Sequence, residues 1–148
     1  MAPQVVNEIA SECLGVRVRL LNRTITRIYD ASLRPHGLTA TQLNLLASIQ
    51  NLEPAQAGEI ARLLSMEIST LSRNAHLMER AGWLTIEPAE HGNGRLLRLT
   101  KEGASKIDEA IPAWRQAQEE TKALLGNKGA SLIRELVDGI WAERLRVG

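Results

Sequence analysis

The chain has 148 residues, of which 44% are hydrophobic and 24% charged, with a formal net charge of +1. This length suits one domain, and this composition is that of a soluble globular protein, so a disordered or fibrous chain is excluded. Cys13 is the only cysteine, which excludes a disulfide framework. The sequence has neither an apolar run of roughly 20 residues nor a signal-peptide pattern, so we expect a cytoplasmic protein without membrane contact.

Charge is spread evenly along the chain. Residues 1–38 carry five Arg and three acidic residues, residues 39–100 five Arg and six acidic residues, and residues 101–148 eight of each sign. Because no segment is strongly basic, a nucleic-acid function has to be argued from residue pattern and not from bulk charge. The chain has no Phe, three Trp and one Tyr, so we expect an aliphatic core.

Residues 7–34 are predicted to form one long helix. Its apolar side chains recur at alternating steps of four and three residues, the spacing of a coiled-coil seam: Leu14, Val18, Leu21, Ile25 and Ile28. Pro35 and Gly37 end the helix. At 1.5 Å per residue it would be about 40 Å long, and a helix of this length in a small domain needs a partner.

Three short helices are predicted next. Thr39, with Gln42 three residues later, has the spacing of a capping box and begins a helix that runs to about residue 50. A turn at 51–55 leads to a second helix over 57–64. A third helix covers 67–81, with Leu71, Ala75 and Met78 facing the core, and Gly82 ends it.

The periodicity then changes to that of strands. Residues 83–87 and 95–99 read as two short strands around a polar, glycine-containing loop at 88–94. Residues 101–125 return to helix, which we expect Pro112 to kink. After a turn at 126–129, a closing helix over 130–146 carries an apolar stripe: Leu132, Ile133, Leu136, Val137, Ile140, Trp141 and Leu145.

This order predicts a mainly α protein, a winged helix-turn-helix with long N- and C-terminal dimerisation helices and a two-stranded wing. The whole chain, 1–148, forms one domain, in which 39–100 is the winged helix-turn-helix lobe and 1–38 and 101–148 are the dimerisation helices. The apolar stripes of these flanks exceed what one small core can bury, so we expect an intertwined homodimer.

The helix at 67–81 is the candidate recognition helix. Its outward face combines short polar groups with a forked donor, the residue types that contact phosphates and base edges: Ser69, Thr70, Ser72, Arg73, Asn74 and His76. A solvated helix face is the alternative interpretation. Such faces usually carry Glu and Lys, which are scarce here, and this favours binding to double-stranded DNA.

Three stretches carry a resemblance to a known family. They are LTATQLNLLASI, AGEIARLLSMEISTLSRNAHLMERAGWL and LLRLTKEG, and the most specific residues are Ser69–Arg73, Glu79–Trp83, Leu99–Thr100 and Gly103. Together they resemble the MarR family of bacterial transcriptional regulators. The resemblance implies a homodimeric repressor or activator whose DNA-binding lobes hang from a helical dimerisation region. It also implies that a small ligand or an oxidant changes the spacing of the lobes.

The wing departs from the family pattern. The family usually has Asp-x-Arg seven to nine residues before the Thr that closes the second strand, and His91, Gly92 and Asn93 hold those places here. We expect Asn93 and Arg95 to be the wing residues that reach DNA. A wing without the usual Arg should make fewer phosphate contacts.

Cys13 is a candidate redox site by resemblance alone. Organic-peroxide sensors of this family carry a reactive Cys in the first long helix, with tyrosines near it, whereas Tyr29 is the only Tyr here. Cys13 also falls about two residues before the sensor position. Arg17, one turn on, could lower the pKa of the thiol, and the alternative is a small buried side chain at a dimer interface.

The sequence contains no other chemical site. The three His and Cys13 lack metal-ligand spacing, and no phosphate loop or nucleophile motif is present, so we expect no metal, no cofactor and no enzyme activity. Trp114 could line a site for a small aromatic or phenolic effector. Two alternative functions stay open: a winged helix that binds protein instead of DNA, and a thiol-based sensor that works through Cys13.

Overall fold

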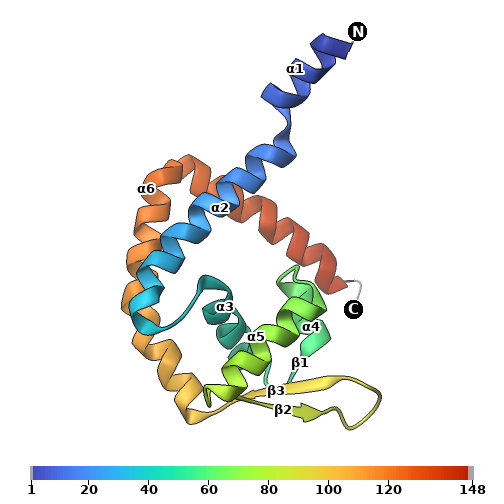
Figure 1. The fold of residues 1–148 in the computed structure, drawn as a ribbon, viewed down its shortest axis with the longest axis vertical. Helices are drawn as coiled ribbons and strands as arrows, with labels where there is room; N and C mark the ends of the chain where they lie inside the picture. Colours follow the sequence, from blue (N-terminus) through green and yellow to red (C-terminus); the bar gives the residue numbers. More distant parts are fainter. Residues whose placement is uncertain (1, 147–148) are drawn as a thin grey trace.

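The computed structural model describes residues 2–146 and is mainly helical (Figure 1). Its elements, in chain order, are α1 (Ala2–Glu12), α2 (Leu14–Leu33), the short 3-10 helix η1 (Arg34–His36), α3 (Ala40–Asn51), β1 (Ala55–Gln56), α4 (Ala57–Leu63), α5 (Ile68–Arg80), β2 (Leu84–Pro88), β3 (Arg95–Leu99) and α6 (Lys101–Arg146). This is the predicted order of a winged helix-turn-helix between long helices. Among residues 2–146 no helix has both the length and the apolar character that a membrane span requires.

The predicted single helix over 7–34 is wrong, because two helices cover this region. Cys13 has an extended backbone (φ −62°, ψ 109°) and separates α1 from α2. Gly15, two residues on, weakens the helix there, since glycine costs about 1 kcal/mol relative to alanine in a helix. In consequence α1 projects away from the rest of the chain (Figure 1).

The short helices begin and end where local signals place them. Thr39 Oγ1 accepts from the Gln42 amide at 3.2 Å, and Gln42 Oε1 accepts from the Thr39 amide at 3.1 Å, so the predicted capping box is confirmed. The positive φ of Gly82 (81°) confirms it as the residue that ends α5. An additional link fixes α3 to α2, because Asp30 Oδ1 accepts from the Ala40 amide at 2.7 Å.

The sheet has three strands, in the order β1-β3-β2, and both pairings are antiparallel. The β2–β3 hairpin is the predicted two-stranded wing, with Leu84 opposite Leu99 and Pro88 opposite Arg95. The prediction missed β1, whose two residues pair with Leu97 and Leu96 of β3. Because β1 directly precedes α4, this pairing joins the wing to the helix-turn-helix.

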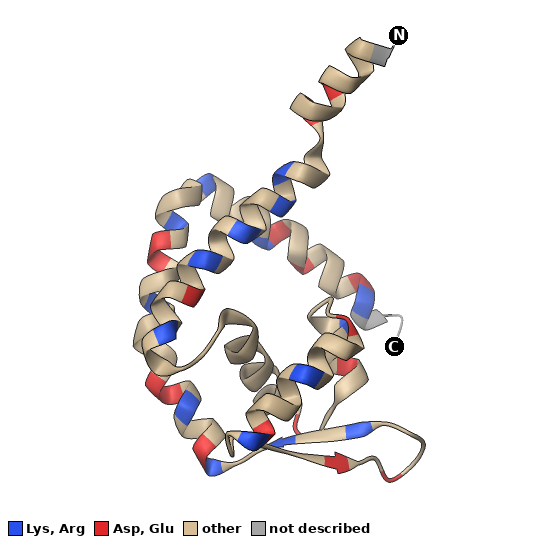
Figure 2. Cartoon of the chain, viewed as in Figure 1, with Lys and Arg blue, Asp and Glu red and all other residues tan. Residues whose placement is uncertain are grey.

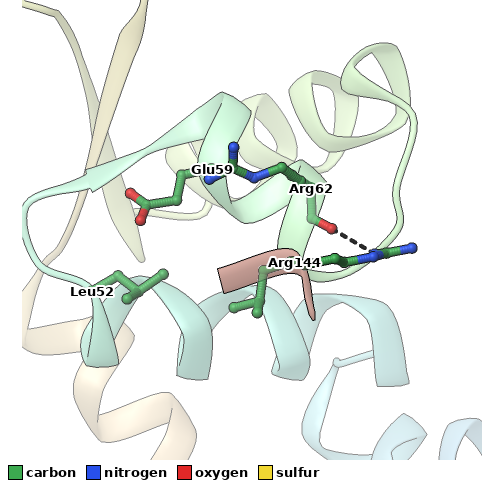
Figure 3. Close-up of a pocket in the computed structure, with 5 residues that line it drawn as sticks. Leu52, Glu59, Arg62 and Arg144 are labelled. Atoms are coloured by element: carbon green, nitrogen blue, oxygen red, sulfur yellow. Dashed lines mark hydrogen bonds between the residues drawn. The ribbon is translucent and has the colours of Figure 1, made fainter. Parts of the chain in front are cut away.

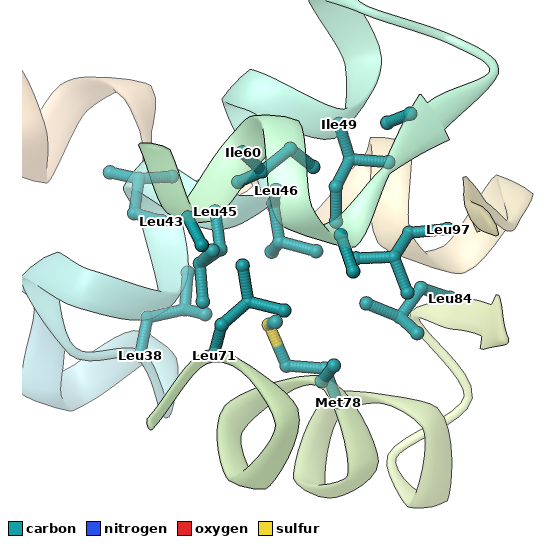
Figure 4. Packing of buried hydrophobic residues seen from close by; sticks show 14 of the residues in the cluster. Leu38, Leu43, Leu45, Leu46, Ile49, Ile60, Leu71, Met78, Leu84 and Leu97 are labelled. Carbon is teal, nitrogen blue, oxygen red and sulfur yellow. The ribbon is translucent and has the colours of Figure 1, made fainter. Parts of the chain in front are cut away.

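The core of the lobe lies between α3, α4, α5 and the sheet (Figure 4). Its largest fully buried side chains are aliphatic or sulfur-containing, none is aromatic, and Leu33 of α2 joins those of the lobe: Leu45, Leu46, Ile49, Ile60, Leu71, Met78, Leu84 and Leu97. Leu71, Ala75 and Met78 are all buried, which confirms the predicted inward face of α5. That face fixes which residues of α5 point away from the protein.

The first half of α6 packs on α2 through small residues. Ala110, Ala113 and Ala117 are buried and recur at steps of three and four, so they form one stripe of the helix that lets α2 approach closely. Ser32 Oγ donates to the Ala113 carbonyl at 2.8 Å, and the Tyr29 hydroxyl donates to Gln118 Oε1. Burial raises the pKa of the Tyr29 hydroxyl above its ordinary value.

The second half of α6 turns back toward the lobe. Gly126 has a non-helical backbone (φ 70°, ψ 165°), which confirms the predicted interruption at 126–129, whereas Pro112 lies within the continuous first half. The segment after Gly126 returns toward α4, so that α2, α6 and the lobe surround a central opening in the ribbon (Figure 1).

Both flanks expose many large apolar side chains. On α1 and α2 these are Val5, Val6, Ile9, Leu14, Val16, Val18 and Leu20, and on the second half of α6 they are Leu132, Leu136, Ile140 and Trp141. Leu14 is 75% exposed and Leu136 is 61% exposed, although both belong to the predicted apolar stripes. Leu145 belongs to the same stripe, but its side chain lies outside the part of the chain that the structure describes. One chain alone therefore leaves a large apolar surface uncovered.

Candidate nucleic-acid interface

The outward face of α5 is polar from Ser69 to His76, and exposed apolar side chains, Ile68 and Leu77, stand at its two ends. The predicted contact residues all lie off the buried stripe, with Ser69, Ser72, Arg73 and His76 exposed and Thr70 and Asn74 half-buried. Because α5 is the second helix of the helix-turn-helix, this face is the one that such motifs place in the major groove. The structure thus brings six predicted site residues together on one surface.

Thr70 organises its neighbours on this face. Its Oγ1 accepts from Arg73 Nη2 at 3.3 Å, and its backbone carbonyl accepts from Asn74 Nδ2 at 3.0 Å. Both bonds join residues three or four apart, which lie next to each other on a helix. The guanidinium of Arg73 is therefore held near Thr70 while it remains exposed to an approaching ligand.

Glu79 ties the far end of α5 to the wing. Its Oε1 accepts from the Ile86 amide of β2 at 3.2 Å, and its Oε2 lies 3.6 Å from His76 Nδ1. The first bond fixes the wing relative to α5. Sequence alone does not indicate this role of Glu79, because its bond to Ile86 forms only when the wing packs on α5.

Arg95 lies against α5. A cavity of about 110 Å³ between α5 and the sheet is lined by Ser72 and His76 from α5 and by Arg95 from β3. Arg95 is exposed and pairs across the sheet with Pro88. Of the two predicted wing residues, Arg95 thus joins the surface of α5, whereas Asn93 lies in the exposed loop beyond the strands.

The other arginine of the wing is paired. Arg98 Nε lies 3.3 Å from Glu87 Oε2, and its Nη1 lies 4.0 Å from Glu53 Oε1. On α5 and in the wing, basic residues stand beside acidic ones, whereas α2 carries four arginines and only one acidic residue, Asp30 (Figure 2). With a formal net charge of +1, the overall field attracts a polyanion weakly, so binding of a nucleic acid by this surface would depend on a few placed contacts.

Two apolar cavities lie between the lobe and the helical flank. The larger, about 490 Å³, is bordered by α2, α3 and α6 and has Tyr29, Trp114 and Trp141 in its lining. The smaller, about 230 Å³, is lined by Leu43, Asn44 and Trp114 among others. Trp114, which we expected to lie near a pocket, borders both cavities.

Cys13 lies at the break between α1 and α2, where its thiol is free and half-buried. The guanidinium of Arg17 donates to the Ser11 carbonyl, so it is directed to the backbone of α1. Within residues 2–146 no three His, Cys, Asp or Glu side chains come together as a metal site would require.

Comparisons with known proteins agree with this geometry. The family model described as MarR family matches residues 36–92. The multiple antibiotic resistance protein MarR of Salmonella typhimurium is 29% identical over 122 residues, which are 80% of this chain and 85% of that protein. The crystal structure of the M. tuberculosis transcriptional regulator MosR in complex with DNA is 32% identical, with a TM-score of 0.76 over 91% of this chain and 99% of that one.

A more distant structure shares the fold. BpsR of Bordetella bronchiseptica is 18% identical, with a TM-score of 0.76 over 88% of this chain and 94% of that one. The matched family model covers α3 to the wing loop, which is the part of the lobe that carries the polar face of α5. This chain belongs to the MarR family of transcriptional regulators, which are DNA-binding proteins and not enzymes.

Proposed function

We propose that this protein is a homodimeric, sequence-specific regulator of transcription that binds double-stranded DNA in the cytoplasm and releases it in response to a small effector. In this proposal 39–100 is the DNA-binding lobe, and 1–38 and 101–148 form the dimer. The observation that carries it is the outward face of α5, where exposed polar side chains stand opposite a fully apolar buried stripe.

The first turns of α5 would enter the major groove. Ser69, Thr70 and Ser72 have short side chains that let the helix approach the base edges, and Arg73 supplies a forked donor for guanine or phosphate. Asn74 and His76 follow on the same face. The hydrogen bond from Arg73 to Thr70 supports this role, because it limits the conformations that the guanidinium has to lose on binding.

The wing would add a smaller contribution. Arg95 borders the same cavity as Ser72 and His76, so it can reach the backbone beside the groove that α5 occupies. Asn93, in the exposed loop, can donate to a phosphate oxygen. With Arg98 paired to Glu87, we expect fewer wing contacts than the usual Asp-x-Arg wing provides.

Dimerisation is supported by the uncovered apolar surface. Leu14 and Val18 on α2, and Leu132, Leu136 and Ile140 on α6, are all about half exposed or more. Burial of a leucine side chain contributes about 1.5–3 kcal/mol, so a second copy that covers these stripes would stabilise both chains.

Effector control is supported by the cavities at the junction of lobe and flank. The cavity of about 490 Å³ has the size of a small-molecule site, and its lining is mainly apolar with Tyr29, Trp114 and Trp141. These rings suit a small aromatic or phenolic compound. DNA binding by BpsR, which shares this fold, is regulated by 6-hydroxynicotinic acid.

Selection of duplexes from a random-sequence DNA library by the full chain tests the proposal. We expect a recovered site with two similar half-sites about one helical turn apart, as a symmetric dimer requires, and sedimentation of the free protein as a dimer. Failure to enrich any sequence would contradict the DNA function and favour a winged helix that binds protein.

A further inference from the structure

The end of α6 is bound to the helix-turn-helix of its own chain. Trp141 Nε1 donates to the Leu63 carbonyl at 3.2 Å. One turn later, Arg144 Nη1 donates to the Arg62 carbonyl at 2.9 Å (Figure 3). It also donates to Ser65 Oγ. These bonds join residues about 80 positions apart, and we call the pair Trp141 and Arg144 the α6 latch.

The α6 latch binds the point at which the chain turns from α4 into α5. Carbonyl groups at the end of a helix lack partners within the helix, and a cation there interacts favourably with the helix dipole. The turn itself is tightly wound, because Ser65 has a positive φ of 51° and the Met66 amide donates to the Ala61 carbonyl at 2.8 Å. A residue other than glycine keeps such a φ only when surrounding groups hold it there, and Arg144 is one of the groups that hold Ser65.

The latch can open because few other contacts hold the end of α6 in place. Arg144 also borders a cavity of about 60 Å³, which is lined by Leu52, Glu59, Arg62, Leu63 and Arg144 (Figure 3). Trp141 is 41% exposed, and Ile140 and Leu136 before it are also exposed. The non-helical backbone at Gly126 separates this segment from the part of α6 that packs on α2.

The same segment therefore has two attachments. Its apolar stripe, with Leu132 and Leu136, belongs to the proposed dimer surface, and Trp141 also borders the large cavity between lobe and flank. A change at either place that moves the end of α6 would act directly on the turn before α5. Because α5 begins three residues after Ser65, the orientation of the recognition helix depends on this turn.

We propose that Trp141 and Arg144 are positioning residues that hold the turn between α4 and α5 in the conformation required for DNA binding, so that release of the end of α6 lowers affinity for DNA. The proposal rests on the proposed DNA function and adds how that function is regulated. The physical reason is pre-organisation: with the latch open, the turn has to be ordered again when DNA binds.

Substitution of each latch residue tests the proposal in the full chain, with a duplex selected by the wild-type protein as the probe. Trp141→Phe removes the N–H donor and keeps an aromatic ring without any change of charge. Arg144→Ala removes the guanidinium, and Arg134→Ala, at an exposed position of the same helix, is the control for charge. We expect both latch variants to bind about tenfold more weakly, which is about 1.4 kcal/mol, and Arg134→Ala to bind as the wild type.

The salt dependence of binding separates positioning from direct contact. A latch that acts through the turn leaves the slope of log affinity against log salt unchanged, whereas loss of a phosphate contact lowers it by about one unit. Arg144→Lys, which keeps a donor at this place, should recover part of the affinity. A lower slope in Arg144→Ala together with wild-type binding by Trp141→Phe would overturn the proposal in favour of a direct phosphate contact.

Hydrogen exchange gives a measurement that does not need DNA. In both latch variants we expect faster exchange at the amides of 64–71, at an unchanged thermal midpoint, and no change in Arg134→Ala. If both latch variants bind DNA as tightly as the wild type does, the proposal that the latch positions the turn is overturned. If the wild type enriches no duplex, the proposed DNA function has failed instead, and the two failures are thereby distinguished.

Discussion

Thr100 and Gly82 are joined by a short hydrogen bond between the end of β3 and the end of α5. Thr100 Oγ1 donates to the Gly82 carbonyl at 2.6 Å and accepts from the Gly103 amide at 3.0 Å. The Thr100 amide donates to the Trp83 carbonyl at 3.1 Å. One residue thus closes the wing, begins α6 and fixes the turn after α5, which explains why the family motif includes these positions together.

The first prediction concerns Gly103, which packs directly on that turn. A Cβ at Gly103 would overlap the carbonyl oxygen of Trp83, a backbone atom that cannot move aside. We expect Gly103→Ala to lower the free energy of unfolding by about 1–3 kcal/mol or more. Gly139→Ala is the matched control, because its Cβ meets nothing within 4 Å, and it should stabilise α6 by about 0.5–1 kcal/mol. Chemical denaturation measures both, and equal effects would contradict the packing argument.

The second prediction concerns Arg73. If its guanidinium binds phosphate, Arg73→Ala should weaken binding to every duplex and lower the salt slope by about one unit. If it reads guanine, the loss is confined to one base pair and amounts to about 1–3 kcal/mol. Arg115→Ala, an exposed position of α6, controls for the lost charge. Unchanged binding of Arg73→Ala in both assays would indicate that α5 does not face DNA.

The third prediction concerns the exposed stripe on α6. Leu136→Glu places a charge at the centre of the proposed dimer surface, and burial of an unpaired charge costs about 3 kcal/mol or more, about a hundredfold in the dimer dissociation constant. Ser131→Glu, exposed on the opposite face of the same helix, should leave the dimer intact. Sedimentation velocity distinguishes them. A dimer of wild-type strength in Leu136→Glu would place the interface elsewhere.

The fourth prediction concerns Cys13. Its thiol is half-buried at the break before α2, and the guanidinium of Arg17 is engaged with the Ser11 carbonyl. We expect one equivalent of an organic hydroperoxide to leave DNA binding unchanged in the wild type and in Cys13→Ser alike. Release of DNA by peroxide in the wild type but not in the serine variant would establish the thiol-sensing alternative.

The fifth prediction concerns pH and Tyr29. Because burial raises the pKa of its hydroxyl in the folded chain, the unfolded chain ionises first as pH rises. The contribution of Tyr29 to stability is therefore complete below its ordinary pKa of about 10 and is lost as pH rises through the folded-state value. Tyr29→Phe should lose less stability than the wild type above pH of about 10. Equal alkaline losses in the two proteins would contradict this.

Local signals predicted most of the lobe. The capping box of Thr39 and Gln42, the positive φ of Gly82 and the buried stripe of Leu71, Ala75 and Met78 each depend on residues within a few positions of one another. The polar face of α5 follows from that stripe without further information, because a helix that buries one face exposes the other.

The features that sequence reasoning missed depend on distant contacts. A strand of two residues, β1, has no periodicity of its own and exists because β3 pairs with it. The bonds of Trp141 and Arg144 to α4 become possible only after Gly126 has redirected α6. The sequence also does not determine on which side of the wing Arg95 lies, because this depends on how the hairpin packs on α5.

The aromatic-free core has a consequence for spectroscopy. Because the fully buried side chains of the lobe are aliphatic or methionine, its interior emits no intrinsic fluorescence. The three indoles lie instead at joints between elements: Trp83 below the wing, with Lys106 Nζ 5.4 Å from its ring centre, Trp114 beside both cavities, and Trp141 against α4. Emission from this protein will therefore report first on how its parts move against each other and only later on the melting of its interior. Variants with a single tryptophan would turn each joint into a separate optical signal.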